Sequence, residues 1–223
     1  MSSLSKRLNS HFASCAAVAA AAVAASTASA QVVWHTYGEN GIQVPANSDG
    51  LYFNLLTGAT GTSASSVGGG PWMNPYGSSA TNITWFASSS GGTWRGVNIG
   101  LYGNEVSNLG LGFTVGSSIP NSGAAGTPRF NTSGGTSWAD GLPGDFSLNS
   151  LNYFGFRFQV GTATHYGFGV MRMGAAITER YMMGFAFEST AGASITTTAV
   201  PAPGALALLG AAGLMGSRRR RAA

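Results

Sequence analysis

Apolar residues alternate with small or polar residues most regularly in the C-terminal half of the chain. Phe154, Phe156, Phe158 and Val160 occupy every second position of one segment. A period of two places alternate side chains on opposite faces of a β-strand. Two further rows have the same period: Tyr166, Phe168 and Val170, and then Tyr181, Met183, Phe185 and Phe187. With a short turn at 161–164 and a closing strand at 193–198, this half is predicted to form a β-meander.

The N-terminal half has shorter apolar runs separated by Gly, Ser, Thr and Asn. Strands are predicted at 32–37, 51–56, 83–87, 97–102 and 111–115. Residues 57–70 and 120–135 lack the hydrophobic content to pack on their own and are predicted to be long surface loops. Many short strands with Gly-rich turns favour an all-β fold, an antiparallel two-sheet β-sandwich of the jelly-roll or lectin-like kind. This domain, at 31–199, would bury the aromatic rows between its sheets.

The N-terminus has the pattern of an export signal. Lys6 and Arg7 form a basic region, a run of alanine and valine follows at 16–25, and Ala28 and Ala30 form an A-x-A site. This order is typical of a secretory signal peptide, here at 1–30. Cleavage is predicted between Ala30 and Gln31.

The C-terminus has three parts in sequence. Pro201, Pro203 and Gly204 interrupt any preceding strand, and an uncharged run covers 204–216. As a helix this run would reach about 20 Å, short of the roughly 30 Å hydrocarbon core of a bilayer. Four arginines then follow: Arg218, Arg219, Arg220 and Arg221. Such a cluster is typical of a cytoplasmic end, so with both basic termini inside, the body is predicted to lie outside the inner membrane.

This arrangement, which begins at Val200, resembles the PEP-CTERM sorting signal, in which Val-Pro-Glu-Pro precedes an apolar segment and a basic end. The chain has Ala202 where that motif has Glu. The resemblance implies transient anchoring in the inner membrane and processing by an exosortase-like protease, in addition to signal peptidase. It also implies a destination at the cell surface or in the extracellular matrix. Retention of the 200–223 segment as a short membrane anchor is the alternative that the residues leave open.

A second resemblance lies in the strings YFGFRF, HYG and MGFAFESTAG, which look like the body domain of many exported PEP-CTERM proteins. The matching residues are Tyr153, Gly155, Phe156, Arg157, Phe158, His165, Tyr166, Gly167, Phe185 and Glu188. The family pattern commonly has Trp after the HYG triplet, where this chain has Phe168. The resemblance implies an exported β-domain and no established biochemical activity.

The basic charge of the chain comes from its two ends. The formal net charge is +4, but residues 31–200 contain five arginines, no lysine and seven acidic residues, which gives −2. A nucleic-acid-binding protein needs a basic patch, so no nucleic-acid partner is predicted. The body has no cysteine, and its stability must therefore come from a hydrophobic core.

Three polar residues fall on neighbouring predicted strands. An arginine paired with a glutamate across strands, here Arg157 with Glu188, is predicted to be a structural ion pair. His165 is predicted to be a hydrogen-bonded sheet residue, because His35 is the only other histidine of the body. The His and Cys spacing of a zinc site is absent.

No catalytic residue and no cofactor are predicted. Asp140 and Asp145 in ADGLPGD, with Asp49 elsewhere, are candidates for calcium ligands, although aspartates beside glycines are first of all turn formers. A glycosidase needs two carboxylates at one cleft, and Glu179 and Glu188 could meet there only through tertiary structure. No G-x-S-x-G motif occurs. The chain is therefore predicted not to be an enzyme.

Tryptophans are the best candidates for binding residues. A tryptophan in a sandwich is by default a core residue, and among Trp72, Trp85, Trp94 and Trp138 the better candidates for exposure are Trp72 and Trp138, because Gly and Pro surround them. Exposed aromatic rings stack on sugar rings or form protein interfaces. The leading prediction is an exported, non-catalytic protein of the cell surface or extracellular matrix. The alternative is a lectin-like module that binds extracellular polysaccharide, and a glycan hydrolase ranks third.

Overall fold

A computed structural model describes residues 31–77, 83–87, 94–99, 105–119, 128–131 and 144–201. The chain divides into two units, 1–31 and 32–223, and the strands described below belong to the second unit. Within the described residues there is no helix of the length and hydrophobicity that crossing a membrane requires.

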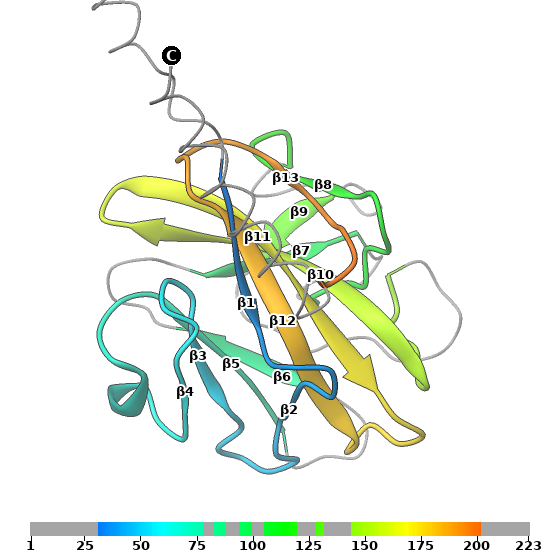
Figure 1. Cartoon of the computed structure of the whole chain (residues 1–223). Coiled ribbons are helices and arrows are strands. Elements are labelled where there is room, and N and C mark those ends of the chain that lie inside the picture. The colour runs from blue at the N-terminus through cyan, green and yellow to red at the C-terminus, as the bar shows by residue number, and fades with distance from the viewer. Residues whose placement is uncertain are drawn as a thin grey trace, which may run out of the picture. The chain divides into compact units, whose positions relative to one another are not determined.

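The described residues form strands and one 3-10 turn (Figure 1). The first strands are β1 (Val32–Thr36), β2 (Ile42–Gln43), β3 (Tyr52–Asn54), β4 (Thr60–Gly61), β5 (Trp72–Tyr76) and β6 (Thr84–Ala87), with the turn η1 (Ser65–Val67) before β5. The later strands are β7 (Arg95–Asn98), β8 (Thr114–Val115), β9 (Arg129–Asn131), β10 (Ser150–Val160), β11 (Ala163–Met173), β12 (Arg180–Glu188) and β13 (Ile195–Thr196).

These strands form three antiparallel sheets. The larger sheet has the order β1-β12-β11-β10-β7-β9, and β2 also pairs with β12. The smaller sheet has the order β4-β3-β5-β6, and β13 and β8 form a two-stranded sheet. The antiparallel two-sheet sandwich predicted from the sequence is therefore confirmed. Its C-terminal half is a meander in which β10, β11 and β12 are consecutive neighbours, as the alternating rows predict.

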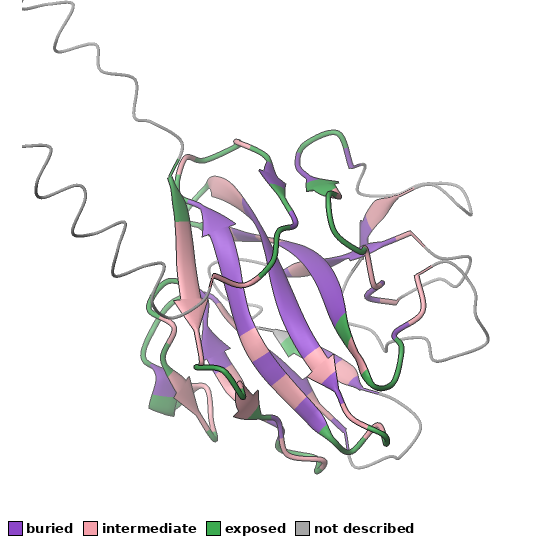
Figure 2. Ribbon diagram, turned by 45° about the vertical axis from the view of Figure 1, so that its right-hand side comes forward, coloured by how far each residue is buried: buried purple, intermediate pink, exposed green. Residues whose placement is uncertain are grey.

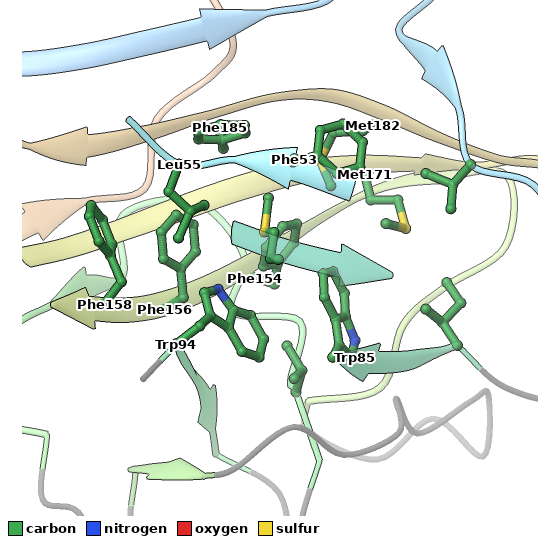
Figure 3. Packing of buried hydrophobic residues seen from close by; sticks show 14 of the residues in the cluster. Phe53, Leu55, Trp85, Trp94, Phe154, Phe156, Phe158, Met171, Met182 and Phe185 are labelled. Atoms are coloured by element: carbon green, nitrogen blue, oxygen red, sulfur yellow. The ribbon is translucent and has the colours of Figure 1, made fainter. Parts of the chain in front are cut away.

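The larger sheet buries both of its faces. On one face Phe154, Phe156 and Phe158 form a cluster with Phe53 of the smaller sheet (Figure 3). Met73 of the smaller sheet belongs to the same cluster. On the other face lie Tyr166, Phe168 and Val170, together with Val115 of β8 and Ile195 of β13. Figure 2 shows the consequence, which is that the central strands are buried along most of their length. A sheet covered on both faces removes far more apolar surface from water than one covered on a single face.

One row of the meander departs from its predicted pattern. Pairing of β11 with β12 joins Val170 to Gly184 but Met171 to Met182, so Met183 is an extra residue, a β-bulge. A bulge reverses the facing of the residues that precede it. Met182, and not Met183, therefore lies in the core cluster with Phe185 and Phe187. The prediction that Tyr181 and Met183 share one face with Phe185 and Phe187 is wrong for this reason.

The predicted strands of the N-terminal half are found near their expected positions, and β2, β4, β5 and β9 are additional. The prediction of a surface loop at 120–135 is wrong at β9, because these residues pair with β7 at the edge of the larger sheet. Residues 57–70, predicted to be a loop, contain β4 and η1. β5 has no counterpart among the predicted strands, because Asn74 and Pro75 stand in its middle, Pro71 precedes it and Gly77 follows it. Pro is depleted in strands because it cannot donate to the hydrogen-bond ladder. Here Pro75 still contributes its carbonyl, which accepts the Leu51 N–H at 3.4 Å.

Candidate binding surface

Three aromatic rings form a continuous row across the smaller sheet. Tyr52 of β3, Trp72 of β5 and Phe86 of β6 lie on neighbouring strands. The ring centroids of Tyr52 and Trp72 are 5.0 Å apart, and those of Trp72 and Phe86 are 5.4 Å apart. We call Tyr52, Trp72 and Phe86 the aromatic row.

Strand alternation places the aromatic row on the outer face of the smaller sheet. Phe53, Met73 and Trp85 are buried in the core between the larger and smaller sheets. Each member of the row is the immediate chain neighbour of one of these core residues, and consecutive residues of a strand point to opposite faces. The row therefore faces away from the core.

The aromatic row is accessible to solvent to different degrees along its length. Phe86 is 49% exposed, whereas Tyr52 and Trp72 are half-buried. The plane of Trp72 is inclined by 58° to that of Tyr52 and by 54° to that of Phe86. The three rings are thus tilted against one another, and the row does not present one flat surface.

Two buried asparagines fix the loops beside the aromatic row. The Asn54 amide group donates to the carbonyls of Val67 and Gly69 at 3.0 and 3.1 Å, and its Oδ1 accepts the Leu56 N–H at 2.9 Å. Asn74 donates to the Asp49 carbonyl at 2.9 Å. Hydrogen bonds from buried amides hold loops in one conformation because breaking them costs free energy, although the buried Asn74 Oδ1 has no partner among the described residues. The row therefore lies between anchored loops.

Of the two tryptophans predicted to bind ligands, the structure places one. Trp72 is part of the aromatic row, and Trp138 lies outside the described residues. Trp85 and Trp94 are buried, as expected, with their rings stacked at 5.5 Å. Tyr52 and Phe86 were missed as members of a binding surface. Strand alternation could have indicated them, because each is the chain neighbour of a core residue and must therefore point to the opposite face of its strand.

The polar residues of the meander have structural contacts. His165 donates from Nδ1 to the Glu188 carbonyl at 2.9 Å and stacks on Phe158 at 5.5 Å, in agreement with its predicted role. Glu188 Oε1 accepts the Thr190 N–H at 3.0 Å. The Arg157 guanidinium lies over the ring of Phe130, 5.1 Å from its centroid. Register places Tyr166 between Arg157 and Glu188, so these two residues are not adjacent across strands.

The calcium candidates do not converge within the part of the chain that the structure describes. Asp49 sits in a turn in which Asn47 Oδ1 accepts the N–H groups of Asp49 and Gly50, at 3.2 and 2.8 Å. Asp145 lies elsewhere, and its carbonyl accepts from Asn108 at 3.4 Å. Asp140 is outside the described residues. No group of three or more His, Cys, Asp or Glu side chains among the described residues is placed to hold a metal ion.

The predicted processing sites fall mostly outside the described residues. Gln31 is exposed, and Val200 packs against the buried residues on the face of the larger sheet where Phe168 and Ile195 lie. Pro201 is half-buried. The remaining residues of the two signals are not described: Ala28, Ala30, Pro203, Gly204, Arg218, Arg219, Arg220 and Arg221.

No protein-family model, curated protein or solved structure matches this chain. Functional proposals therefore depend on its own residues and geometry.

Proposed function

We propose that this chain is an exported, non-catalytic protein of the cell surface or extracellular matrix. The support is the order of its sequence segments: a signal peptide at 1–30, a β-sandwich, and a PEP-CTERM-like signal at 200–223. Transient anchoring in the inner membrane would precede processing by an exosortase-like protease. The body has few charged side chains and a core on both faces of its larger sheet, which suits a stable module outside the cell.

Cell fractionation with intact-mass measurement tests this proposal. We expect a mature species that begins at Gln31, ends near Pro203 and is found outside the inner membrane. A chain that keeps its C-terminal arginines and stays in the inner membrane would contradict processing and would support a retained anchor. A purified protein that hydrolyses a polysaccharide, and loses this activity when one carboxylate is replaced, would contradict the non-catalytic assignment.

We further propose that the body binds extracellular polysaccharide through the aromatic row. The observation that carries this proposal is the contiguous placement of Tyr52, Trp72 and Phe86 on the outer face of one sheet. Sugar rings present apolar C–H faces that stack on aromatic rings, and exposed aromatic patches mark interaction sites. Phe86, at the end of the row, is the member most accessible to a ligand, because it is 49% exposed.

Affinity electrophoresis in gels that contain neutral polysaccharides tests the binding proposal. Trp72→Ala and Phe86→Ala should each lose retardation, because each removes a stacking ring. Tyr181→Ala is the matched control, since Tyr181 is a half-buried aromatic residue on the larger sheet. Retardation that survives the double substitution Trp72→Ala and Phe86→Ala would rule out the aromatic row as the binding site.

A further inference from the structure

Two arginines face each other across neighbouring strands of the larger sheet. Arg95 of β7 pairs directly with Arg157 of β10, and both side chains are half-buried. Like charges directly opposite each other in an antiparallel pair are destabilising. Burial lowers the pKa of Arg157, and the nearby charge of Arg95 lowers this pKa further. The pair therefore places two positive charges side by side at half-buried positions, and their mutual repulsion is unfavourable in the protein without a ligand.

Aromatic rings flank the arginine pair. Phe130 of β9 lies under the Arg157 guanidinium, 5.1 Å away, and its ring is 5.9 Å from that of Tyr166. Tyr166 is the residue directly opposite Arg157 on β11. A guanidinium stacked on a ring uses its face for that contact and keeps its N–H edge free to donate. Phe130 thus orients Arg157 without consuming its donors.

The acidic residue in this row of the sheet is Glu188. Gly167 pairs with Phe187, which places Glu188 beyond Tyr166, two strands from Arg157. At the usual strand spacing this separation is roughly 10 Å between backbones. The carboxylate is held by the Thr190 N–H at 3.0 Å. Screening is strong over about 10 Å in salt, so the adjacent Arg95 affects Arg157 more than Glu188 does.

We infer that Arg95 and Arg157 form a binding site for one oxyanion group, the carboxylate of a uronic acid residue in an acidic polysaccharide. Two guanidinium groups offer paired N–H donors that match a carboxylate, and the bound anion would relieve the repulsion between them. The rings of Phe130 and Tyr166 are buried beside this pair, so they hold the Arg157 guanidinium in place and do not contact the sugar themselves. The choice of a polysaccharide as the source of the carboxylate rests on the proposed matrix location.

Binding of a uronic acid trisaccharide to the full-length protein tests this site. We expect calorimetry to detect binding of trigalacturonate and not of the neutral trisaccharide maltotriose. Arg95→Gln and Arg157→Gln should each weaken the binding at least about tenfold, because each loses a charge-assisted hydrogen bond. Arg172→Gln is the matched control: Arg172 lies on the same sheet and stacks on Tyr181 at 4.4 Å, but faces Leu151 across the strands. The Arg172→Gln variant should bind trigalacturonate with the affinity of the wild type.

Stability without ligand separates a binding role from a structural one. Arg95→Gln removes the repulsion, so it should unfold at the same or a higher urea concentration than the wild type. Equal trigalacturonate affinity in Arg95→Gln, or a clear loss of its ligand-free stability, would overturn the proposal. Sulfate that binds as tightly as trigalacturonate at equal ionic strength would show a site for free inorganic anions instead. Trp72→Ala should keep trigalacturonate affinity, which distinguishes this site from the aromatic row.

Discussion

Glycines opposite phenylalanines set the packing of the central hairpin at the scale of single residues. Gly169 faces Phe154 and Gly167 faces Phe156 across β10 and β11. A Cβ atom at Gly167 would come within 2.6 Å of the Phe156 ring, and one at Gly169 would meet the Phe154 ring. Both rings are fully buried, so they have no room to move aside. The missing side chains of these glycines are part of the core.

Gly169→Ala should therefore destabilise the protein. Overpacking a close-packed core costs about 1–3 kcal/mol, and we expect a loss of that size in the free energy of unfolding measured in urea. Gly69→Ala is the control, because a Cβ atom there would meet no heavy atom within 4 Å. A Gly169→Ala midpoint equal to that of Gly69→Ala would show that the Phe154 ring can shift.

Arg180 is a fully buried cation that holds three backbone carbonyls. Its Nε donates to the Val44 carbonyl at 3.3 Å, and its Nη2 donates to those of Pro45 and Gly77 at 2.7 Å each. Burial lowers the pKa of this guanidinium. Because Gly77 is more than one hundred residues from Arg180 in the sequence, these bonds connect distant segments.

Arg180→Met should leave these carbonyls buried without donors. Each unsatisfied buried acceptor costs about 1–3 kcal/mol, so we expect a loss of at least about 2 kcal/mol in the free energy of unfolding. Arg172→Met, which removes a half-buried arginine with one hydrogen bond to the Asn40 carbonyl, should cost less. Equal losses for the two variants in urea titrations would contradict this account of Arg180.

His35 should make stability depend on pH. Its ring lies 5.0 Å from Phe185, and its buried Nε2 has no hydrogen-bond partner among the described residues. Burial lowers the pKa of His35 below its usual value of about 6.5, although a hydrogen bond with the Leu56 backbone partly opposes this. The unfolded chain then binds the proton more readily, so stability is full above about pH 6.5 and falls as the pH drops towards the folded-state pKa.

Urea midpoints between pH 7.5 and 5.5 check this sign. The wild type should lose stability over this window, and His35→Leu should show a flatter profile because it has no imidazole to protonate. Parallel profiles for the two proteins would assign the loss to other groups.

At the scale of elements, the sequence predicts strands correctly where apolar and polar residues alternate regularly. It fails where the pairing between two strands decides which face a side chain occupies. The phenylalanine row of β10 and the Tyr166 row of β11 follow from a period of two, and both are confirmed. The facing of Tyr181 depends on a bulge, which exists only through the pairing of β12 with β11. No local signal marks that extra residue, because Met182 and Met183 are chemically identical.

The aromatic row and the arginine pair likewise could not be assembled from the sequence alone. Trp72 could be selected from its Gly and Pro neighbours, but its contacts with Tyr52 and Phe86 depend on register across three strands. Arg95 and Arg157 lie in segments far apart in the sequence, and only the non-local pairing of β7 with β10 makes them neighbours. Residue types can thus be nominated from sequence, whereas clusters require the topology of the sheets.

At the scale of the whole molecule, the net charge depends on which of the two terminal signals has been removed. The full chain carries a formal net charge of +4 and has a sequence pI of about 9.6. Lys6 and Arg7 account for two positive charges, and Arg218 to Arg221 account for four. Loss of the signal peptide alone would leave +2, loss of the C-terminal signal alone would leave 0, and loss of both would leave −2.

Isoelectric focusing of the protein from its native cell should therefore give an acidic band. The seven acidic residues of the body outnumber its five arginines, so the doubly processed form must focus below neutrality. A variant in which Pro201 and Pro203 are both replaced by Ala should focus at basic pH, because a disrupted sorting signal would leave the arginines in place. A basic band from the wild type would show that the C-terminal arginines remain. The 200–223 segment would then be a retained, positively charged anchor attached to a negatively charged body, and the prediction of C-terminal processing would be wrong.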